Sequence, residues 1–298
     1  KGTSLGNSAI SGREGTIVIG HKTNASSLYS TVVGTNSKIT SDNTTYTVRG
    51  NFFGIPIEKS VNVQGAVSTS YGASNTITNT EKAFSGVANS IIGSVNTVTN
   101  SNGVTIQGTG NTVSNAYKEM KFGLGDLFNL KNGDYSSLAQ NDSGAIAIIG
   151  GGNTISDQLS STVIGFGNTL KGENSTGVFT AGSHNKLTNV SNSLVMGDHN
   201  KLKDLENVIS LGNNNTVTAN KAVAIGNGAK VEAVGGVAIG VGSVADRAAG
   251  SKGAFAPDII PDVAVHTWRS TAGAVSVGSS SMTRQIINVA AGTKETDA

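Results

Sequence analysis

Two histidines occupy equivalent places in a repeated pattern, and their side chains are the first to consider for chemistry. His184 and His199 each lie two residues after a glycine of the repeat, and Asp198 directly precedes His199. Imidazole and carboxylate groups bind divalent metals such as zinc. However, no cysteine accompanies them, no histidine pair has ligand spacing, and other copies of the repeat carry Gly or Asn at this position. A role in a turn is therefore favoured, and we expect no metal site and no cofactor.

Catalytic chemistry finds little support elsewhere in the sequence. The carboxylates are scattered, mostly in irregular stretches, and no spacing suggests a nucleophile with its base and orienting group. The stretch 150–155 resembles a calcium-binding repeat only superficially, because the aspartate of that motif is missing and the period differs. We expect no catalytic residue and no enzyme activity. Parallel β-helix enzymes exist, so a β-solenoid enzyme is kept as an alternative, beside a non-adhesive structural surface protein.

Composition and charge exclude further classes of protein. The 298 residues include 40 glycines and no cysteine, only 13% are charged, and the formal net charge is +2. With no basic cluster, a nucleic-acid partner is not expected. No apolar run approaches the roughly 20 residues of a membrane helix. The regular spacing of valine and isoleucine argues against a disordered chain, although the composition alone would permit one.

A glycine closes a short β-branched run at nearly constant intervals, and such a period is typical of a solenoid. An interval of 14 to 15 residues accommodates two strands of about five residues and two tight turns, with successive coils in parallel. The glycine itself indicates a turn with positive φ or a close approach of backbones. The clearest glycines of the series are Gly150, Gly165, Gly182, Gly197, Gly212, Gly226 and Gly240.

An asparagine recurs three residues after the glycine, and an apolar residue follows two positions later. Stacked side-chain amides can form hydrogen bonds from one coil to the next, as in other ladders of identical residues. The apolar residue is the expected contribution of the second strand to the core. These asparagines are Asn75, Asn96, Asn111, Asn153, Asn168, Asn185, Asn200 and Asn215.

Alternation within each run divides its side chains between two faces. Val223 and Ile225 face one way, while Ala222 and Ala224 face the other. We expect the large residues to fill the roll and the small ones to form a flat face that would be exposed along the whole series. Such a face predicts self-association.

Two sequence features resemble the trimeric autotransporter adhesins, and more narrowly a YadA-like head joined to its neck. One is the repeated Val-Ala-Ile-Gly, and the other is the run that ends the sequence after residue 283. Residues 268–278 are similar to fusobacterial members of the family. The neck residues that the resemblance implies are Arg284, Gln285, Ile286, Asn288, Val289, Ala290, Ala291 and Gly292.

The resemblance implies an all-β fold, a left-handed parallel β-roll solenoid with 14–15 residue coils that forms a homotrimer. It assigns residues 1–278 to the head and 279–298 to a neck segment, with stalk and membrane anchor expected beyond it. The implied location is the bacterial cell surface, anchored in the outer membrane. The implied partners are a host cell-surface receptor, of the CEACAM type for example, or a matrix protein such as collagen.

Three irregular insertions interrupt the repeat, at about 41–65, 114–144 and 246–272. They contain most of the large aromatic residues, which is why we expect the receptor-binding surface there, with 114–144 as the first choice. Local cores for these loops are an alternative interpretation. An aligned threonine series, Thr76 to Thr216, would suggest ice binding, but lysines interrupt it. The expected receptor-binding residues are Tyr117, Phe122, Leu124, Leu127, Phe128, Tyr135, Phe52, Phe53, Trp268 and Arg269.

Overall fold

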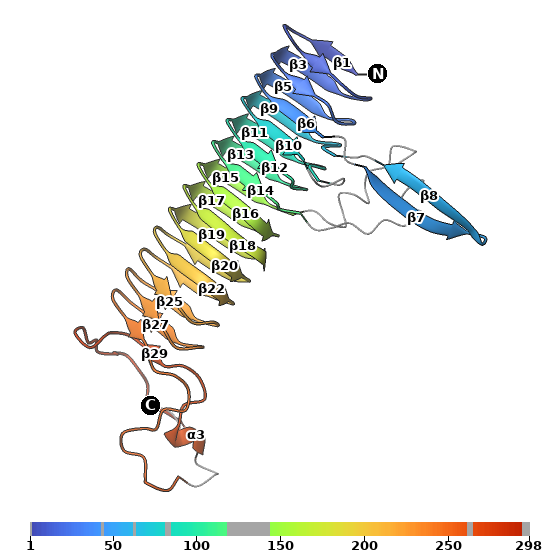
Figure 1. The fold of residues 1–298 in the computed structure, drawn as a ribbon. Coiled ribbons are helices and arrows are strands. Elements are labelled where there is room, and N and C mark those ends of the chain that lie inside the picture. The colour runs from blue at the N-terminus through green and yellow to red at the C-terminus, as the bar shows by residue number, and fades with distance from the viewer. Residues whose placement is uncertain are drawn as a thin grey trace. The chain divides into compact units, whose positions relative to one another are not determined.

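The computed structural model describes residues 2–42, 45–61, 64–80, 85–117, 144–260 and 265–293. The described chain is almost entirely β-structure, in two parallel sheets of 14 and 13 strands and one separate hairpin. It divides into two compact units, Lys1–Thr180 and Ala181–Ala298. The all-β prediction and the two strands per coil are confirmed: successive strands alternate between the two sheets (Figure 1).

In the first unit, every coil gives one strand to each sheet, and each strand pairs in parallel with the strand of the next coil. The first sheet contains β1 (Thr3–Leu5), β3 (Ile17–His21), β5 (Thr31–Thr35), β9 (Thr69–Ala73), β11 (Ser90–Ser94), β13 (Thr105–Thr109), β15 (Ala147–Gly151) and β17 (Thr162–Phe166). The second sheet contains β2 (Ile10–Ser11), β4 (Asn24–Ala25), β6 (Lys38–Ser41), β10 (Thr76–Asn79), β12 (Thr97–Thr99), β14 (Thr112–Ser114), β16 (Thr154–Leu159) and β18 (Thr169–Thr176).

The second unit repeats the same arrangement, and β19 (Val178–Ser183) lies across the boundary between the units. Its first sheet contains β21 (Ser193–Met196), β23 (Ile209–Leu211), β25 (Val223–Ile225), β27 (Val237–Ile239) and β29 (Val275–Ser276). Its second sheet contains β20 (Lys186–Ser191), β22 (Lys201–Glu206), β24 (Thr216–Val217), β26 (Lys230–Val231) and β28 (Val244–Ala245).

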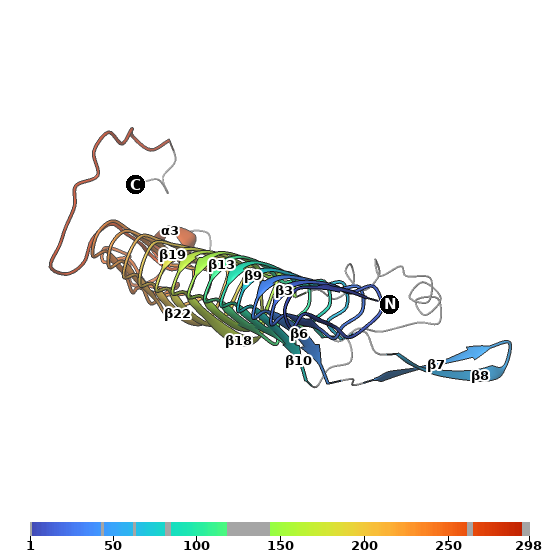
Figure 2. The ribbon, with the colours of Figure 1, turned by 90° about the horizontal axis from the view of Figure 1, so that it is seen from above.

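The core of the first unit consists of two apolar columns that lie between the two sheets. Figure 2 shows the ribbon of the stacked coils from above. Because side chains alternate along a strand, one residue of each short run points inward in every coil. Val18, Val32 and Ile91 fill the column of the first sheet, while Ile39 and Ile77 fill that of the second, all fully buried. Burial of an aliphatic side chain of this size stabilises the fold by about 1.5–3 kcal/mol.

The repeat glycines have positive φ and also allow a close approach between coils, so both explanations drawn from the sequence are confirmed. Gly212 has φ +117°, and a Cβ added there would overlap the carbonyl oxygen of Gly226 in the next coil. Gly20 and Gly34 show the same relation in the first unit. The glycines are therefore in register and stack directly on one another.

The buried asparagines form the predicted ladder. In the first unit, Oδ1 of Asn96 accepts hydrogen bonds from the backbone N and from Nδ2 of Asn111, each at 3.0 Å. The amide group of Asn111 also donates to the carbonyl oxygen of Gly150, at 2.9 Å. This last bond was not predicted from the sequence. It links the asparagine of one coil to the glycine turn of the next, so the two repeated residues act together.

The insertion at about 41–65 carries an antiparallel hairpin, β7 (Tyr46–Phe52) and β8 (Ile55–Val61), which pairs with neither long sheet. The connection is the two-residue loop Phe53-Gly54, in which both residues have positive φ. Figure 1 shows the hairpin as a separate ribbon in the first unit. The insertion was expected, but its hairpin structure was not.

The other two insertions leave the stacking of the coils intact. On either side of the second one, Thr105 pairs with Ala147 and Thr112 pairs with Thr154 in unbroken register. The third includes the short helix α3 (Val265–Trp268). Residues 118–143 lie outside the described part of the chain.

Candidate functional site

The outer face of the first sheet carries an apolar column in each unit. In the second unit, Met196, Leu211, Ile225 and Ile239 are paired in register on successive strands. Met196 and Ile239 are each 43% exposed, and Ile225 is 37% exposed. We call these four residues the second-unit column. Soluble monomers rarely expose large contiguous apolar patches, so this face is a candidate interaction surface.

The prediction that Val223 and Ile225 fill the roll is wrong. Ala222 and Ala224 are fully buried, whereas Val223 is half-buried and Ile225 is exposed. The burial pattern gives the reason: in both units the residue two positions before the repeat glycine points inward, and Ala224 holds the position that Val18 and Ile91 hold in the first unit. Ile225, one residue later, therefore lies outside. The exposed face is consequently apolar and bulky rather than flat and small.

The first unit carries the same outer column with more variation. Leu5, Ile19, Val33, Tyr71, Ile92, Gln107, Ile149 and Ile164 lie in register on the strands from β1 to β17. Ile92 and Ile149 are about half exposed. One polar residue, Gln107, interrupts this first-unit column.

The hairpin tip is the most exposed apolar feature of the first unit. Phe53 is 91% exposed and Ile55 is 66% exposed, with Ile57 less so. Phe53 has φ +50° and Gly54 has φ +83°, the pattern of a type I′ turn, in which asparagine is the usual first residue. Phe52 ends β7 next to this loop. Two of the predicted receptor-binding residues thus lie at or beside the tip.

The remaining predicted receptor-binding residues lie in the other two insertions. Tyr117 is half-buried, and Phe122, Leu124, Leu127, Phe128 and Tyr135 lie outside the described residues. Trp268 is half-buried at the end of α3, and its carbonyl oxygen accepts a bond of 2.8 Å from the N–H of Gly253. The exposed Arg269 donates to the carbonyl oxygen of Gly250, at 3.2 Å. The third insertion is therefore closed on itself by 250–253 and 268–269.

Arg284, the first neck residue, closes the last coil of the second unit. Its guanidinium donates to the carbonyl oxygen of Val241 at 2.7 Å, to the carbonyl oxygen of Val277, and to Ser243 Oγ at 3.2 Å. Val241 and Ser243 follow β27 and Val277 follows β29, so this side chain links the turns after the last two strands of the first sheet. The other neck residues are exposed in irregular backbone, with Ile286, Ile287 and Val289 each more than 60% exposed. These apolar groups add to the surface that a partner copy could cover.

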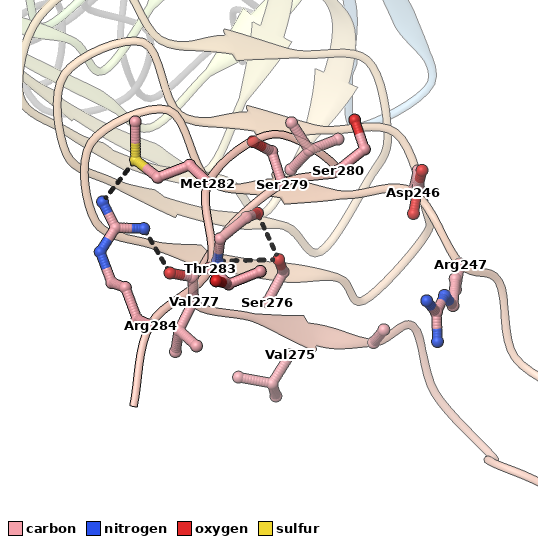
Figure 3. A pocket seen from close by; sticks show the side chains of 13 residues that line it. Asp246, Arg247, Val275, Ser276, Val277, Ser279, Ser280, Met282, Thr283 and Arg284 are labelled. Carbon is pink, nitrogen blue, oxygen red and sulfur yellow. Dashed lines mark hydrogen bonds between the residues drawn. The ribbon is translucent and has the colours of Figure 1, made fainter. Parts of the chain in front are cut away.

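A pocket of about 510 Å³ lies beside Arg284 (Figure 3). Asp246 is the only carboxylate among its lining residues, and no histidine or lysine is present there. The hydroxyl of Ser276 donates to the carbonyl oxygen of Gly278 at 2.8 Å, so it is engaged in a turn. The lining does not bring together the nucleophile, base and orienting group that hydrolytic chemistry needs. Its residues are Val244, Asp246, Arg247, Ala274, Val275, Ser276, Val277, Gly278, Ser279, Ser280, Met282, Thr283 and Arg284.

His184 and His199 do come together, as stacked rings with centroids 5.0 Å apart. Both have positive φ, which agrees with the turn role drawn from the sequence. Asp198 Oδ1 accepts bonds from the hydroxyl of Ser183 at 2.7 Å and from its backbone N–H at 2.9 Å. These bonds hold the pKa of Asp198 below its ordinary value. Within the described residues, no three His, Asp or Glu side chains gather as a metal site.

The second sheet presents a hydrated outer face. In the first unit, Thr76, Thr97, Thr112, Thr154 and Thr169 lie in register as predicted. In the second unit, Lys186, Lys201 and Lys230 share the column with Thr216. The lysines interrupt the threonine series there, so this face offers few apolar anchors to a protein partner.

Within the described part of the chain, no helix is long and apolar enough to cross a membrane. Comparison with protein-family models gave no match for this sequence. No curated protein matches it either.

Proposed function

We propose that this chain is the head of a bacterial surface adhesin that assembles as a homotrimer through the outer face of its first sheet. The observation that carries the proposal is the second-unit column, with Met196, Ile225 and Ile239 exposed in register. A parallel series of apolar residues can be covered by identical copies arranged around one axis, which gives closed cyclic symmetry. The threefold arrangement, a left-handed roll and an outer-membrane location follow from the resemblance to trimeric autotransporter adhesins.

The adhesive contacts of this head are proposed to lie in the insertions rather than on the regular strands. Protein interfaces concentrate their binding energy in a few aromatic, Arg or large aliphatic residues. The described strands of the second sheet offer Thr and Lys outward, whereas Phe53, Trp268 and Arg269 lie in insertions. The partner class is a host receptor or a matrix protein. Three copies per head would let weak single contacts combine into firm attachment through avidity.

A deletion of 117–143 tests the adhesive surface, and the structure shows where to cut. The N–H of Asn102 donates to the carbonyl oxygen of Ala116 at 2.9 Å, and its own carbonyl oxygen accepts from Gly144 N at 2.7 Å. Ala116 and Gly144 therefore lie side by side, and a short Gly-Ser linker can join them without disturbing the coils. We expect a folded head whose binding to host cells is at least about tenfold weaker, as the loss of a hot spot implies.

The matched comparison replaces 251–269 in the third insertion by a linker of the same kind, because the N–H of Gly250 donates to the carbonyl oxygen of Ser270 at 2.6 Å and the two cut ends are therefore adjacent. A binding screen against matrix proteins and cell-surface receptors identifies the partner first. If binding survives both deletions and the loss of the hairpin 46–61, the contacts lie on the regular strands and the proposed adhesive surface is wrong.

A further inference from the structure

The tip of the β7–β8 hairpin carries a band of apolar and uncharged residues on both strands. Residues 50–57 contain no charge, and the flanking residues Arg49 and Glu58 face each other in the register of the hairpin. Phe53 and Ile55 are largely exposed, and Pro56 and Ile57 are exposed as well. The uncharged band is thus bounded by one opposite-charge pair at a fixed distance from the turn.

The residue at the first position of the turn lowers the stability of the hairpin. A type I′ turn favours Asn or Gly at its first central position, because both central residues need positive φ. Phe53 occupies that position at φ +50°, where a bulky side chain is unfavourable. The hairpin pairs with neither long sheet, and Phe53 is 91% exposed. A strained residue held in an exposed place points to a function rather than to folding.

The backbone of the tip carries one unpaired N–H fewer than an ordinary hairpin of the same length. Phe52 and Ile55, on either side of the two-residue loop, are the first paired residues, so strand pairing begins directly at the turn. The alternation of an antiparallel ladder places the next pair, Asn51 with Pro56, in the non-bonded position, where N–H groups point away from the partner strand. Proline has no N–H to lose there, and it also blocks addition of a further strand at that edge.

We infer that this hairpin tip inserts into the interface of a lipid bilayer. The band from the turn to residues 50 and 57 is four residues long, or roughly 10–13 Å at the rise of a β-strand. Amphipathic helices at a bilayer interface bury their apolar face about 5–10 Å into the boundary between headgroups and acyl chains, and we take the same depth for the hairpin tip. Insertion to that depth would bury Phe53, Ile55 and Ile57 and leave Arg49 and Glu58 among the headgroups. Because the uncharged sequence 50–57 includes residues of both strands, it suits a uniform medium better than a one-sided protein pocket.

This membrane contact is additional to receptor binding and does not rest on it. The test is sedimentation of the full chain with phosphatidylcholine vesicles, which contain no protein receptor. We expect the chain to sediment with the vesicles, with little dependence on salt, because the inserted band carries no charge. Phe53→Asn should weaken partitioning by at least about tenfold, which is the effect of no longer burying a phenylalanine side chain.

Phe53→Asn also separates the membrane contact from folding. Asparagine is favoured at this turn position, so the melting temperature of the variant should be equal or higher. The matched control is Phe255→Asn, because Phe255 is 93% exposed but lies between Lys252 and Asp258. We expect it to leave partitioning unchanged. Failure of the unaltered chain to bind vesicles would overturn the inference, as would equal binding by Phe53→Asn. Weaker attachment of Phe53→Asn to cells, without vesicle binding, would assign the tip to a protein partner instead.

Discussion

Gly212→Ala should destabilise the head severely, although it adds only one carbon atom. Gly212 has φ +117°, a backbone conformation that side chains rarely adopt. The added Cβ would also overlap the carbonyl oxygen of Gly226, and the coils on both sides leave no room for the backbone to move. Backbone strain of about 1–3 kcal/mol and overpacking of about 1–3 kcal/mol combine to a loss of several kcal/mol per chain.

Gly228→Ala is the matched control for that substitution. Gly228 also has positive φ, at +68°, but a Cβ added there meets nothing within 4 Å. We expect a loss of only about 1–2 kcal/mol, from the left-handed backbone alone. Thermal or urea unfolding of the two variants measures the difference. Equal stability of the two variants would contradict the direct stacking of glycine turns.

Asn200→Ala should have the second large effect, because it breaks the amide ladder in the second unit. The Nδ2 group of Asn200 donates to Asn185 Oδ1 at 2.9 Å and to the carbonyl oxygen of Gly212 at 2.8 Å. Its Oδ1 accepts from the backbone N of Asn215 at 3.0 Å. The substitution leaves buried donors and acceptors without partners, each at about 1–3 kcal/mol. We expect the free energy of unfolding to fall by about 3–5 kcal/mol in total.

Asn227→Ala serves as its control, since Asn227 is exposed on a turn of the same unit. Surface changes of this kind are usually within about 0.5 kcal/mol. Urea unfolding should therefore give a much lower midpoint for Asn200→Ala than for Asn227→Ala. Similar midpoints would mean that the buried ladder stabilises the coils no more than a hydrated surface amide does, and the expected effect of Asn200→Ala would be wrong.

The solenoid could be predicted from the sequence because its period is enforced by single residues. Gly212 and Asn200 belong to the repeated glycines and asparagines, and the nearly constant spacing of these residues can be read directly from the sequence. The alternation of side chains along the strand also correctly assigned Val223 and Ile225 to one face and Ala222 and Ala224 to the other. It could not tell which set lies inside, because alternation alone does not say which face of a strand is turned toward the core. The structure turns the residue two positions before each repeat glycine inward in both units, and in this coil that residue is Ala224.

The candidate site was predictable only in outline. Insertions appear in the sequence as losses of period, so the stretch around Phe53 could be located. The hairpin could not be predicted, because Phe53-Gly54 lacks the Asn-Gly sequence that is typical of the type I′ turn it adopts. The hydrogen bonds from Arg284 to the carbonyl oxygens of Val241 and Val277 could not be predicted either, because no local sequence pattern indicates which carbonyl oxygens this side chain reaches.

The mass of the purified head in solution tests the central proposal most directly. An exposed apolar column such as Met196, Leu211, Ile225 and Ile239 should be covered by identical copies. Light scattering after size-exclusion chromatography should therefore give three times the chain mass of 30.0 kDa. A single folded species with the mass of one chain would contradict the trimeric head.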